Sequence, residues 1–372
     1  MNGAIFALIA FHTDSPISRL PSRRRRRSDS VTDCSCAETT ATRRRSRARS
    51  FRAVGAPRQF SPTDPARYVG TVRHTSQQLD TWRRDGGVIL DSFFTTEELA
   101  PCVDGMEALY GHLRPDDPSA HENFDARTRY IQQFANTTDL PFHANPELNL
   151  LGLHPALIAC AREALGTDDV RMYQCHTWAK FTGQTDFDQP FHCDYKNHTL
   201  TVPGEDAVDR TINFMIYLTD VTDEHGAIHY VPVPESDPIT GPMRPQFAGE
   251  AAGYEEQLRA IERSGAAPAG SIFAYGIDVF HRGTNLTAPD GFRYTITASY
   301  KAAGNDQIGW SAWPRYFREP WHLVMDHATV EQRTCLGIPA PGDPFWTDLT
   351  VARTTERWPN ADWSEYETAL SV

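Results

Sequence analysis

Residues 292–301 read FRYTITASYK and alternate between apolar and polar side chains at every position. Such period-two alternation predicts a β-strand with two different faces. The apolar face carries Phe292, Tyr294, Ile296, Ala298 and Tyr300, and the polar face carries Arg293, Thr295, Thr297 and Ser299. A hydroxyl-bearing face with a single Arg, on a strand this apolar on its other side, suits the interior of a barrel that holds a small polar ligand.

Further strands are expected upstream, at residues 88–90, 171–181, 211–219, 227–231 and 271–277. Helices are expected at residues 72–84, after a cap at Thr95 or Thr96, and at residues 156–165, where Gly166 ends the pattern. Several short strands after an N-terminal helical section predict a mainly β fold with flanking helices. The expected core is a double-stranded β-helix, a jelly-roll of the cupin-like kind.

The chain of 372 residues divides by composition. Residues 1–58 hold 13 Arg and four acidic residues, a net charge of +9, and we expect this Arg/Ser-rich leader to be disordered. It is a nucleic-acid or membrane-surface arm, a transit-type leader, or sequence from an over-long reading frame. Order is expected to begin near Phe60, and residues 59–372 are expected to form one domain. Within it the β-helix core spans about 170–302, and a Trp-rich extension (303–372), with one helix at 319–336, packs over the barrel.

Charge and cysteine content exclude several classes. Beyond residue 58 the chain carries the other 23 basic residues and 44 acidic ones, a net charge of −21, which argues against nucleic-acid binding. The apolar run at residues 4–11 is too short to span a bilayer, so no membrane association is expected. Seven scattered Cys with no CxxC pair indicate neither a zinc site nor a disulfide framework, which favours the cytoplasm. The sequence does not indicate an oligomeric state.

His192, Asp194 and His281 are the candidate metal ligands and catalytic residues. In an extended segment residues i and i+2 point the same way, so His192 and Asp194 can reach one ion together. Two imidazoles and one carboxylate are the facial set that binds iron(II) and leaves coordination positions open, whereas zinc hydrolases more often use a closer pair. With 14 His in the chain, a chance His-x-Asp pair is the competing interpretation.

Arg293, twelve residues after His281, strengthens the metal interpretation. Its planar guanidinium can hold a carboxylate through two hydrogen bonds, and Thr295 on the same face can add a hydroxyl. Lys180, twelve residues before His192, is a further candidate for the same co-substrate. Weaker candidates for the lining of the site are Asn213, Met215, Tyr195, Asn197 and Trp178, and His198 can hydrogen-bond nearby. His225 and His229 were alternatives for the third ligand, but neither is followed by an Arg at strand spacing.

Several segments resemble one known family. Residues 82–89 (WRRDGGVI) and 93–99 (FFTTEEL) look like the opening of phytanoyl-CoA dioxygenase-like proteins, and 189–195 (QPFHCDY) is similar to their first metal motif. Residues 218–222 (LTDVT), 226–228 and 231–232 match the middle strands, and 281–285 (HRGTN) with Arg293 resembles the last ligand and the co-substrate anchor. The similarity covers about residues 75–302. Residues 232–236 (PVPES) depart from the Pro-Gly-Ser-His stretch usual there, in the loop over the site that contacts substrate.

This resemblance implies an oxidoreductase, a dioxygenase that uses iron(II), 2-oxoglutarate and dioxygen. It implies that His192, Asp194 and His281 bind the iron and that Arg293 holds the far carboxylate of 2-oxoglutarate. The products are succinate, CO2 and a hydroxylated substrate. Related halogenating enzymes lack the carboxylate ligand so that halide takes its position, and the presence of Asp194 therefore favours hydroxylation.

Two other functions remain open. One is a barrel that binds a metal or ligand without turnover, and the other is a metal-dependent hydrolase or isomerase on the same fold. The substrate is expected to be a small molecule. The acidic body offers no obvious basic groove for the phosphates of coenzyme A, which favours a secondary metabolite or another small hydrophobic compound over an acyl thioester.

Overall fold

The structure is a computed structural model, and it describes residues 72–117, 131–184, 187–202, 204, 206–241, 245, 247–248, 253–309 and 319–371. The leader expected at 1–58 and the start of order expected near Phe60 lie outside these residues, as do Trp310 and Trp313 of the C-terminal extension.

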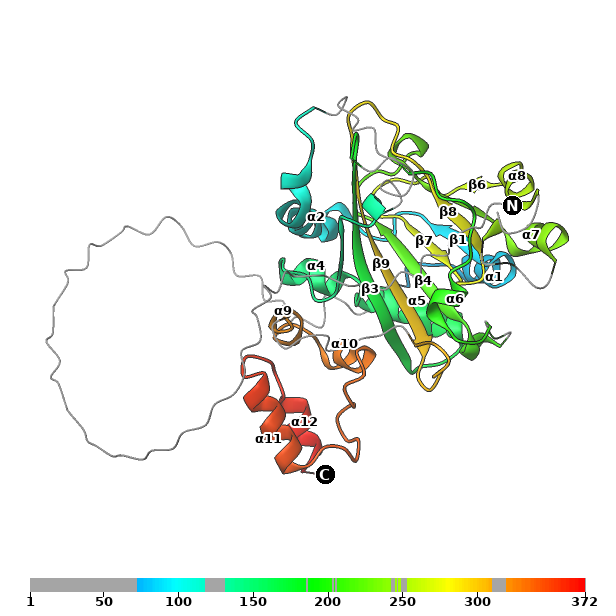
Figure 1. The fold of residues 1–372 in the computed structure, drawn as a ribbon. Coiled ribbons are helices and arrows are strands. Elements are labelled where there is room, and N and C mark those ends of the chain that lie inside the picture. Colours follow the sequence, from blue (N-terminus) through cyan, green and yellow to red (C-terminus); the bar gives the residue numbers. More distant parts are fainter. Residues whose placement is uncertain are drawn as a thin grey trace, which may run out of the picture. The chain divides into compact units, whose positions relative to one another are not determined.

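Two antiparallel sheets form the centre of the described chain (Figure 1). The larger sheet has the order β1 (Gly87–Leu90), β7 (Ile272–Tyr275), β4 (Thr211–Tyr217), β9 (Phe292–Ala302), β3 (Val170–Phe181) and β2 (Thr137–Asp139). The smaller sheet has the order β6 (Arg263–Ser264), β5 (Ile228–Val231) and β8 (Phe280–Gly283). This jelly-roll with flanking helices confirms the predicted fold class. The larger sheet also takes in β1 and β2, which lie upstream of the 170–302 core that the sequence indicated.

Strand β9 lies inside the larger sheet and pairs with β3 and β4. Its apolar face packs in the largest hydrophobic core, together with helices described below. Its polar face is buried too, and Thr295 and Ser299 have no exposed surface. The alternation of residues 292–301 therefore separates the helix-covered outer face of the sheet from the interior between the sheets.

Helices α1 (Ser76–Asp85), α2 (Thr96–Tyr110), α4 (Pro146–Leu151) and α5 (Pro155–Leu165) contribute to that outer core. Helix α1 begins four residues after the predicted start, because Thr75 caps it through a capping box with Gln78. The stop predicted at Gly166 is confirmed, and Gly86 ends α1 in the same way. Their φ angles are 64° and 77°, a left-handed conformation that favours glycine.

Short helices and turns connect the remaining strands. They are η2 (Gly111–Leu113), α6 (Tyr195–His198), η3 (Ala207–Asp209), η4 (Asp223–His225), α7 (Val233–Thr240) and α8 (Tyr254–Arg259). Helix α7 starts in the stretch that departs from the family pattern, with Pro232 as its N-cap residue. Strand β4 ends at Tyr217, two residues before the predicted end.

The C-terminal helices are α9 (His322–Met325), α10 (Val330–Cys335), α11 (Asp348–Arg357) and α12 (Ser364–Ala369). The single helix predicted at 319–336 is wrong. Thr329 caps a new helix through a capping box with Gln332, and this divides the segment into α9 and α10. Gln332 donates a hydrogen bond to the Leu153 carbonyl, which ties α10 to the segment before α5.

None of the helices within the described ranges is long and apolar enough to cross a membrane.

Candidate metal centre

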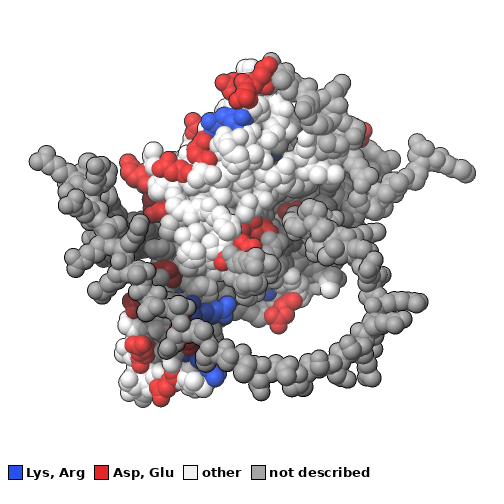
Figure 2. Space-filling model, turned by 60° about the vertical axis from the view of Figure 1, so that its left-hand side comes forward, with Lys and Arg blue, Asp and Glu red and all other residues white. Residues whose placement is uncertain are grey.

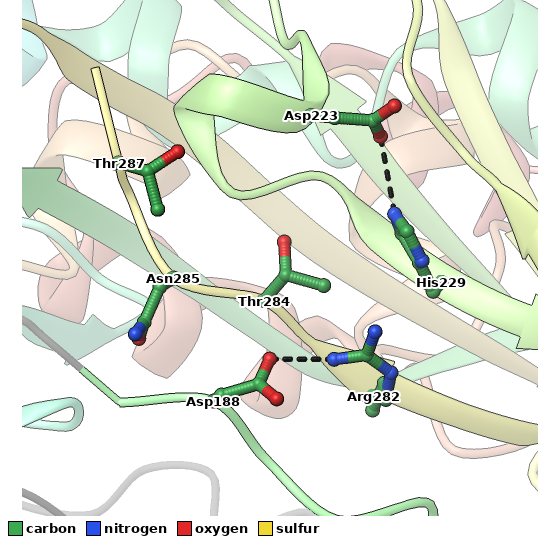
Figure 3. A pocket seen from close by; sticks show the side chains of 7 residues that line it. All are labelled: Asp188, Asp223, His229, Arg282, Thr284, Asn285 and Thr287. Atoms are coloured by element: carbon green, nitrogen blue, oxygen red, sulfur yellow. Dashed lines mark hydrogen bonds and ion pairs between the residues drawn. The ribbon is translucent and has the colours of Figure 1, made fainter. Parts of the chain in front are cut away.

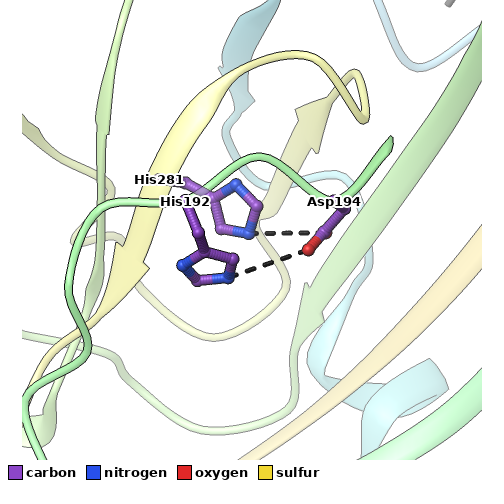
Figure 4. Close-up of side chains that lie close together, drawn as sticks. All are labelled: His192, Asp194 and His281. Carbon is purple, nitrogen blue, oxygen red and sulfur yellow. Dashed lines mark ion pairs between the residues drawn. The ribbon is translucent and has the colours of Figure 1, made fainter. Parts of the chain in front are cut away.

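The structure brings His192, Asp194 and His281 together from two parts of the chain (Figure 4). His192 and Asp194 lie between β3 and α6, and His281 lies in β8. One nitrogen or oxygen atom from each residue lies within 4.8 Å of the other two. The Nε2 atoms of His192 and His281 lie 3.7 and 3.4 Å from the two carboxylate oxygens of Asp194.

Backbone hydrogen bonds explain why two distant segments meet here. His192 and His281 exchange two N–H···O bonds, each of 3.0 Å, as in an antiparallel ladder. Three residues before His192 and two after His281, the Gln189 N–H donates to the Gly283 carbonyl at 2.9 Å, and the Gly283 N–H donates to Gln189 Oε1 at 2.7 Å. His281 therefore belongs to a strand, whereas the sequence placed it after one. The four residues of β8 are too few to show a period.

Each imidazole is oriented by a carbonyl two residues upstream. Nδ1 of His192 lies 3.0 Å from the Pro190 carbonyl, and Nδ1 of His281 lies 3.0 Å from the Val279 carbonyl. A carbonyl only accepts, so Nδ1 carries the proton and the lone pair of Nε2 faces Asp194. This is the arrangement in which histidines bind metals, with the second nitrogen held by an outer partner.

The charges also fit a metal site. Burial, reinforced by the neighbouring His281, lowers the pKa of His192 to about 4, so its imidazole is neutral at pH 7. Burial alone would raise the pKa of Asp194, but the imidazoles of His281 and His192 outweigh it and hold that pKa below its usual value. The donor set is two imidazole nitrogens and one carboxylate, which suits iron(II). Cys193 points away, with its Sγ donating to the Asp278 carbonyl at 3.4 Å.

A second part of the interior is cationic. Lys180 and Arg293 are direct register partners on β3 and β9, and both are buried. Lys180 Nζ donates to the Thr284 carbonyl at 3.0 Å, and Arg293 donates to the Gly226 carbonyl. No carboxylate within the described ranges forms an ion pair with either side chain. Two adjacent buried cations without an anion are costly unless an anionic ligand joins them.

The pKa shifts of these two cations, and buried polar atoms beside them, also favour an anionic ligand at this place. Burial lowers the pKa of Arg293 to about 10, and burial with the nearby Arg293 charge holds the pKa of Lys180 well below its usual value. Arg293 Nε and Thr295 Oγ1 are buried and have no hydrogen-bond partner among the residues that the structure describes. Three residues chosen from the sequence therefore offer hydrogen-bonding capacity to one carboxylate, which fits 2-oxoglutarate.

The structure places the weaker sequence candidates in different surroundings, and only some of them lie near the interior face of β9. Trp178 and Asn213 are register neighbours of the inner face of β9, and Trp178 Nε1 donates to Thr297 at 3.0 Å. His198 Nδ1 lies 2.9 Å from the Tyr173 hydroxyl, and the charge of Asp194 acts on it. Met215, which is half-buried, and Tyr195, which is buried, pack in separate apolar clusters. Asn197 is exposed, which contradicts its expected place in the lining.

Two residues near the centre were missed. His176 and Gln174 precede Trp178 and Lys180 at period-two spacing, and their register partners are Thr297 and Ser299 on the polar face of β9. Residues 171–181 alternate between the two faces of β3. Because apolar side chains occur on both faces, the inner row could not be identified from the sequence.

The pocket in Figure 3, of about 360 Å³, lies elsewhere. His229 and Arg282 face each other in the register of β5 and β8 and alternate with His281, so they occupy the opposite face of the smaller sheet. Asp223 lies 3.1 Å from His229, and Asp188 accepts a hydrogen bond from Arg282 at 2.5 Å. Its charged side chains are thus already paired, and the third-ligand alternative His229 belongs to this pocket and not to the metal centre. His225 caps the nearby turn, 2.8 Å from the Thr222 hydroxyl.

Comparison with known proteins supports one family. The family description Phytanoyl-CoA dioxygenase (PhyH) matches residues 82–293. No curated protein sequence matches the chain.

Solved structures with a similar fold include three proteins of low identity. The ketoglutarate-dependent carbocyclase SnoK of nogalamycin biosynthesis is 18% identical, with 62% of this chain and 85% of SnoK covered and a TM-score of 0.45. EctD from S. alaskensis is 17% identical, with 68% and 87% covered and a TM-score of 0.46. HygX from Streptomyces hygroscopicus, with nickel and 2-oxoglutarate bound, is 14% identical, with 62% and 88% covered and a TM-score of 0.41.

The family match extends from α1 to Arg293 in β9 and spans more than half of the chain. The chain therefore belongs to the phytanoyl-CoA dioxygenase family of iron(II)- and 2-oxoglutarate-dependent enzymes.

Proposed function

We propose that this enzyme hydroxylates a C–H bond of a small molecule. The observation that carries the proposal is the carboxylate of Asp194, which faces the Nε2 atoms of both His192 and His281. A complete set of two histidines and one carboxylate leaves no ligand position that halide must fill, so the chemistry expected is oxygen transfer to carbon.

Each residue has a distinct task in this proposal. His192, Asp194 and His281 hold iron(II), and the carbonyls of Pro190 and Val279 fix the two imidazoles. Arg293, Lys180 and Thr295 hold the far carboxylate of 2-oxoglutarate in the buried cationic end of the interior. When bound, iron(II) would activate dioxygen, which is the oxidant, and 2-oxoglutarate would supply two electrons by its decarboxylation, so that one oxygen atom ends in succinate beside CO2 and the other in the product. The protein contributes orientation and exclusion of water.

Access of substrate to the site is consistent with the burial pattern. The side chains of His192 and Asp194 keep 16% and 19% of their surface exposed, whereas that of His281 keeps 6%. A molecule that arrives from solvent therefore meets the His192–Asp194 side of the set first. The described residues on the face in Figure 2 are mostly uncharged, with scattered acidic groups and few Lys or Arg.

The test is succinate formation from 2-oxoglutarate with iron(II) under air, in the wild type and in His192→Ala. We expect slow succinate release without substrate, and a fall of at least about 100-fold in His192→Ala, since one ligand of three is lost. The control is Cys193→Ser, whose side chain points away from the set. Iron-dependent binding with no turnover would favour a non-catalytic barrel, and activity without dioxygen would favour a hydrolase or isomerase.

Product mass distinguishes the oxidative outcomes. Hydroxylation adds one oxygen atom, derived from dioxygen, to the substrate. Loss of two hydrogens would indicate ring closure and an unchanged mass would indicate epimerisation, and either product would contradict the hydroxylase proposal.

We also place this enzyme in the cytoplasm. Within the described ranges, Cys102, Cys160, Cys175, Cys193 and Cys335 are buried and form no disulfide, which supports a reducing compartment.

A further inference from the structure

The inner face of β3 carries a row of side chains that the proposed chemistry does not use. Gln174, His176 and Trp178 lie on this row before Lys180, with Ser299, Thr297 and Thr295 opposite them on β9. Lys180 belongs to the co-substrate end of the row. The other three lie farther along the same wall, which is where a substrate shares the interior with 2-oxoglutarate.

A chain of hydrogen bonds orients the ring of His176. The Ser299 hydroxyl donates to Gln174 Oε1 at 3.4 Å, and Gln174 Nε2 lies 3.0 Å from His176 Nδ1. With the amide nitrogen as donor, Nδ1 of His176 accepts, and the ring proton must lie on Nε2. Burial lowers the pKa of His176 to about 4, so the ring is a neutral donor at pH 7. No hydrogen-bond acceptor among the described residues takes the Nε2 proton.

This donor lies on the interior wall that faces the metal centre. On β3 it shares a face with Lys180, and the charge of Asp194 acts on it. The His176 ring packs edge-on against Trp178, with ring centroids 4.8 Å apart. The Trp178 N–H already donates to the Thr297 hydroxyl, so this side chain contributes an aromatic surface and not a hydrogen-bond donor. His176 is thus one neutral hydrogen-bond donor next to an aromatic surface.

We infer that His176 recognises the substrate through Nε2–H, and that the substrate is an uncharged small molecule with a carbonyl, hydroxyl or ether oxygen near the C–H bond that reacts. This inference rests on the proposed function. Trp178 packs against the apolar body of such a molecule. An anionic substrate would compete for Lys180 and Arg293, and a cationic one would need Asp139, which lies opposite His176 and already has an interaction partner.

The test compares probes that share a carbon skeleton and differ in the oxygen. The probes are two matched pairs, cyclohexanone with methylenecyclohexane and cyclohexanol with methylcyclohexane, and two charged compounds, cyclohexanecarboxylate and cyclohexylamine. Each probe is added to holoenzyme with iron(II) and 2-oxoglutarate. The readout is stimulation of 2-oxoglutarate consumption over the rate without probe in the same variant. We expect an oxygenated probe to stimulate about tenfold more than its hydrocarbon twin, the size of one hydrogen bond.

Variants assign this preference to His176. In His176→Phe the ratio between twins falls to about one, and His176→Gln, which keeps an N–H donor, restores part of it. Thr177→Val is the matched control: Thr177 is on the same strand but faces outward, where its hydroxyl lies 2.6 Å from the Tyr110 hydroxyl, and the ratio is retained. No preference in the wild type, a preference that survives in His176→Phe, or greater stimulation by a charged probe overturns the inference.

A second measurement does not depend on the variants folding. Two-bond ¹H–¹⁵N spectra of zinc(II)-loaded, ¹⁵N-histidine-labelled protein with 2-oxoglutarate should show His176 with its proton on Nε2. A proton on Nδ1 overturns the inference. Failure of the proposed function is seen separately, as absence of iron-dependent 2-oxoglutarate consumption in the wild type without any probe.

Discussion

Arg293 is a buried guanidinium whose only hydrogen bond within the described ranges goes to a backbone carbonyl, that of Gly226. If it holds 2-oxoglutarate, Arg293→Leu removes a charge-assisted, two-point contact. We expect KM for 2-oxoglutarate to rise about 100-fold, with a smaller rise in Arg293→Lys, because an ammonium makes one contact where the guanidinium makes two. Steady-state kinetics with varied 2-oxoglutarate measures this.

Arg171→Lys is the control for Arg293. Arg171 lies at the other end of β3, paired with Asp169, and its replacement should leave KM unchanged. A KM for 2-oxoglutarate that is the same in Arg293→Leu and wild type would remove Arg293 from the co-substrate site.

Lys180, the neighbour of Arg293, should make the binding of 2-oxoglutarate depend on pH. Its pKa is held well below the usual value by burial and by Arg293, so free enzyme carries less than a full charge there as pH rises. A bound carboxylate raises that pKa, so binding takes up a proton, and affinity falls as pH rises above the lowered pKa of the free enzyme. Calorimetry of N-oxalylglycine binding to manganese(II)-loaded protein, in buffers of different ionisation enthalpy, should show proton uptake. Lys180→Met should abolish it, and equal uptake in both proteins would exclude Lys180.

At the scale of elements, helix α2 is held by its first turn. Thr95 and Glu98 form a capping box, and Glu98 also accepts two hydrogen bonds from Arg73, at 2.7 and 2.9 Å. Burial alone would raise the pKa of Glu98, but His154 and Arg73 outweigh it and hold the pKa well below its usual range. The stabilisation is thus complete above pH of about 4.3, the unfolded value, and is lost as pH falls through the folded pKa.

Glu98→Gln should therefore lower the free energy of unfolding by about 2 kcal/mol at pH 7, and by less below pH of about 4. Urea unfolding at both pH values measures the difference. Glu107→Gln, in an exposed pair with Arg114, should change stability by less than about 0.5 kcal/mol. A Glu98→Gln effect that grows on acidification would contradict the proposed role of the ionised carboxylate.

Elements with two unlike faces could be predicted from sequence, and elements defined by distant partners could not. Residues 292–301 predicted β9 because one face meets helices and the other meets the interior. Strand β8 was missed because four residues show no period and because its partners, β5 and the backbone at His192, are distant in sequence. The helix predicted at 319–336 was wrong because the apolar pattern was followed across Thr329, although the capping box of Thr329 and Gln332 marks the start of a new helix in the sequence itself. The inner row with His176 needed the register of β3 and β9.

At the scale of the whole molecule, the site spans both sheets. His281 comes from the smaller sheet, Arg293 and Lys180 come from the larger one, and His192 and Asp194 come from the segment between β3 and β4, which pairs with β8 through His192 and His281. In the proposed function, a metal with its co-substrate would therefore join parts that the chain itself connects mainly through loops. Ligands that bind only the folded state raise its stability by mass action, about 2.7 kcal/mol at 100 times Kd.

We accordingly expect nickel(II) and N-oxalylglycine, which cannot turn over, to raise Tm together by about 5–10 °C, and by more than the two separate shifts combined. The reason for the excess is that the analogue binds both the metal and the cations of the opposite sheet, so each ligand strengthens the binding of the other. Thermal unfolding followed by circular dichroism measures this. Arg293→Leu should keep the nickel shift and lose the excess, whereas His192→Ala should lose both. Shifts that merely add in the wild type would mean that metal and co-substrate occupy separate sites, and the assignment of Arg293 and Lys180 to the iron's co-substrate would then be wrong.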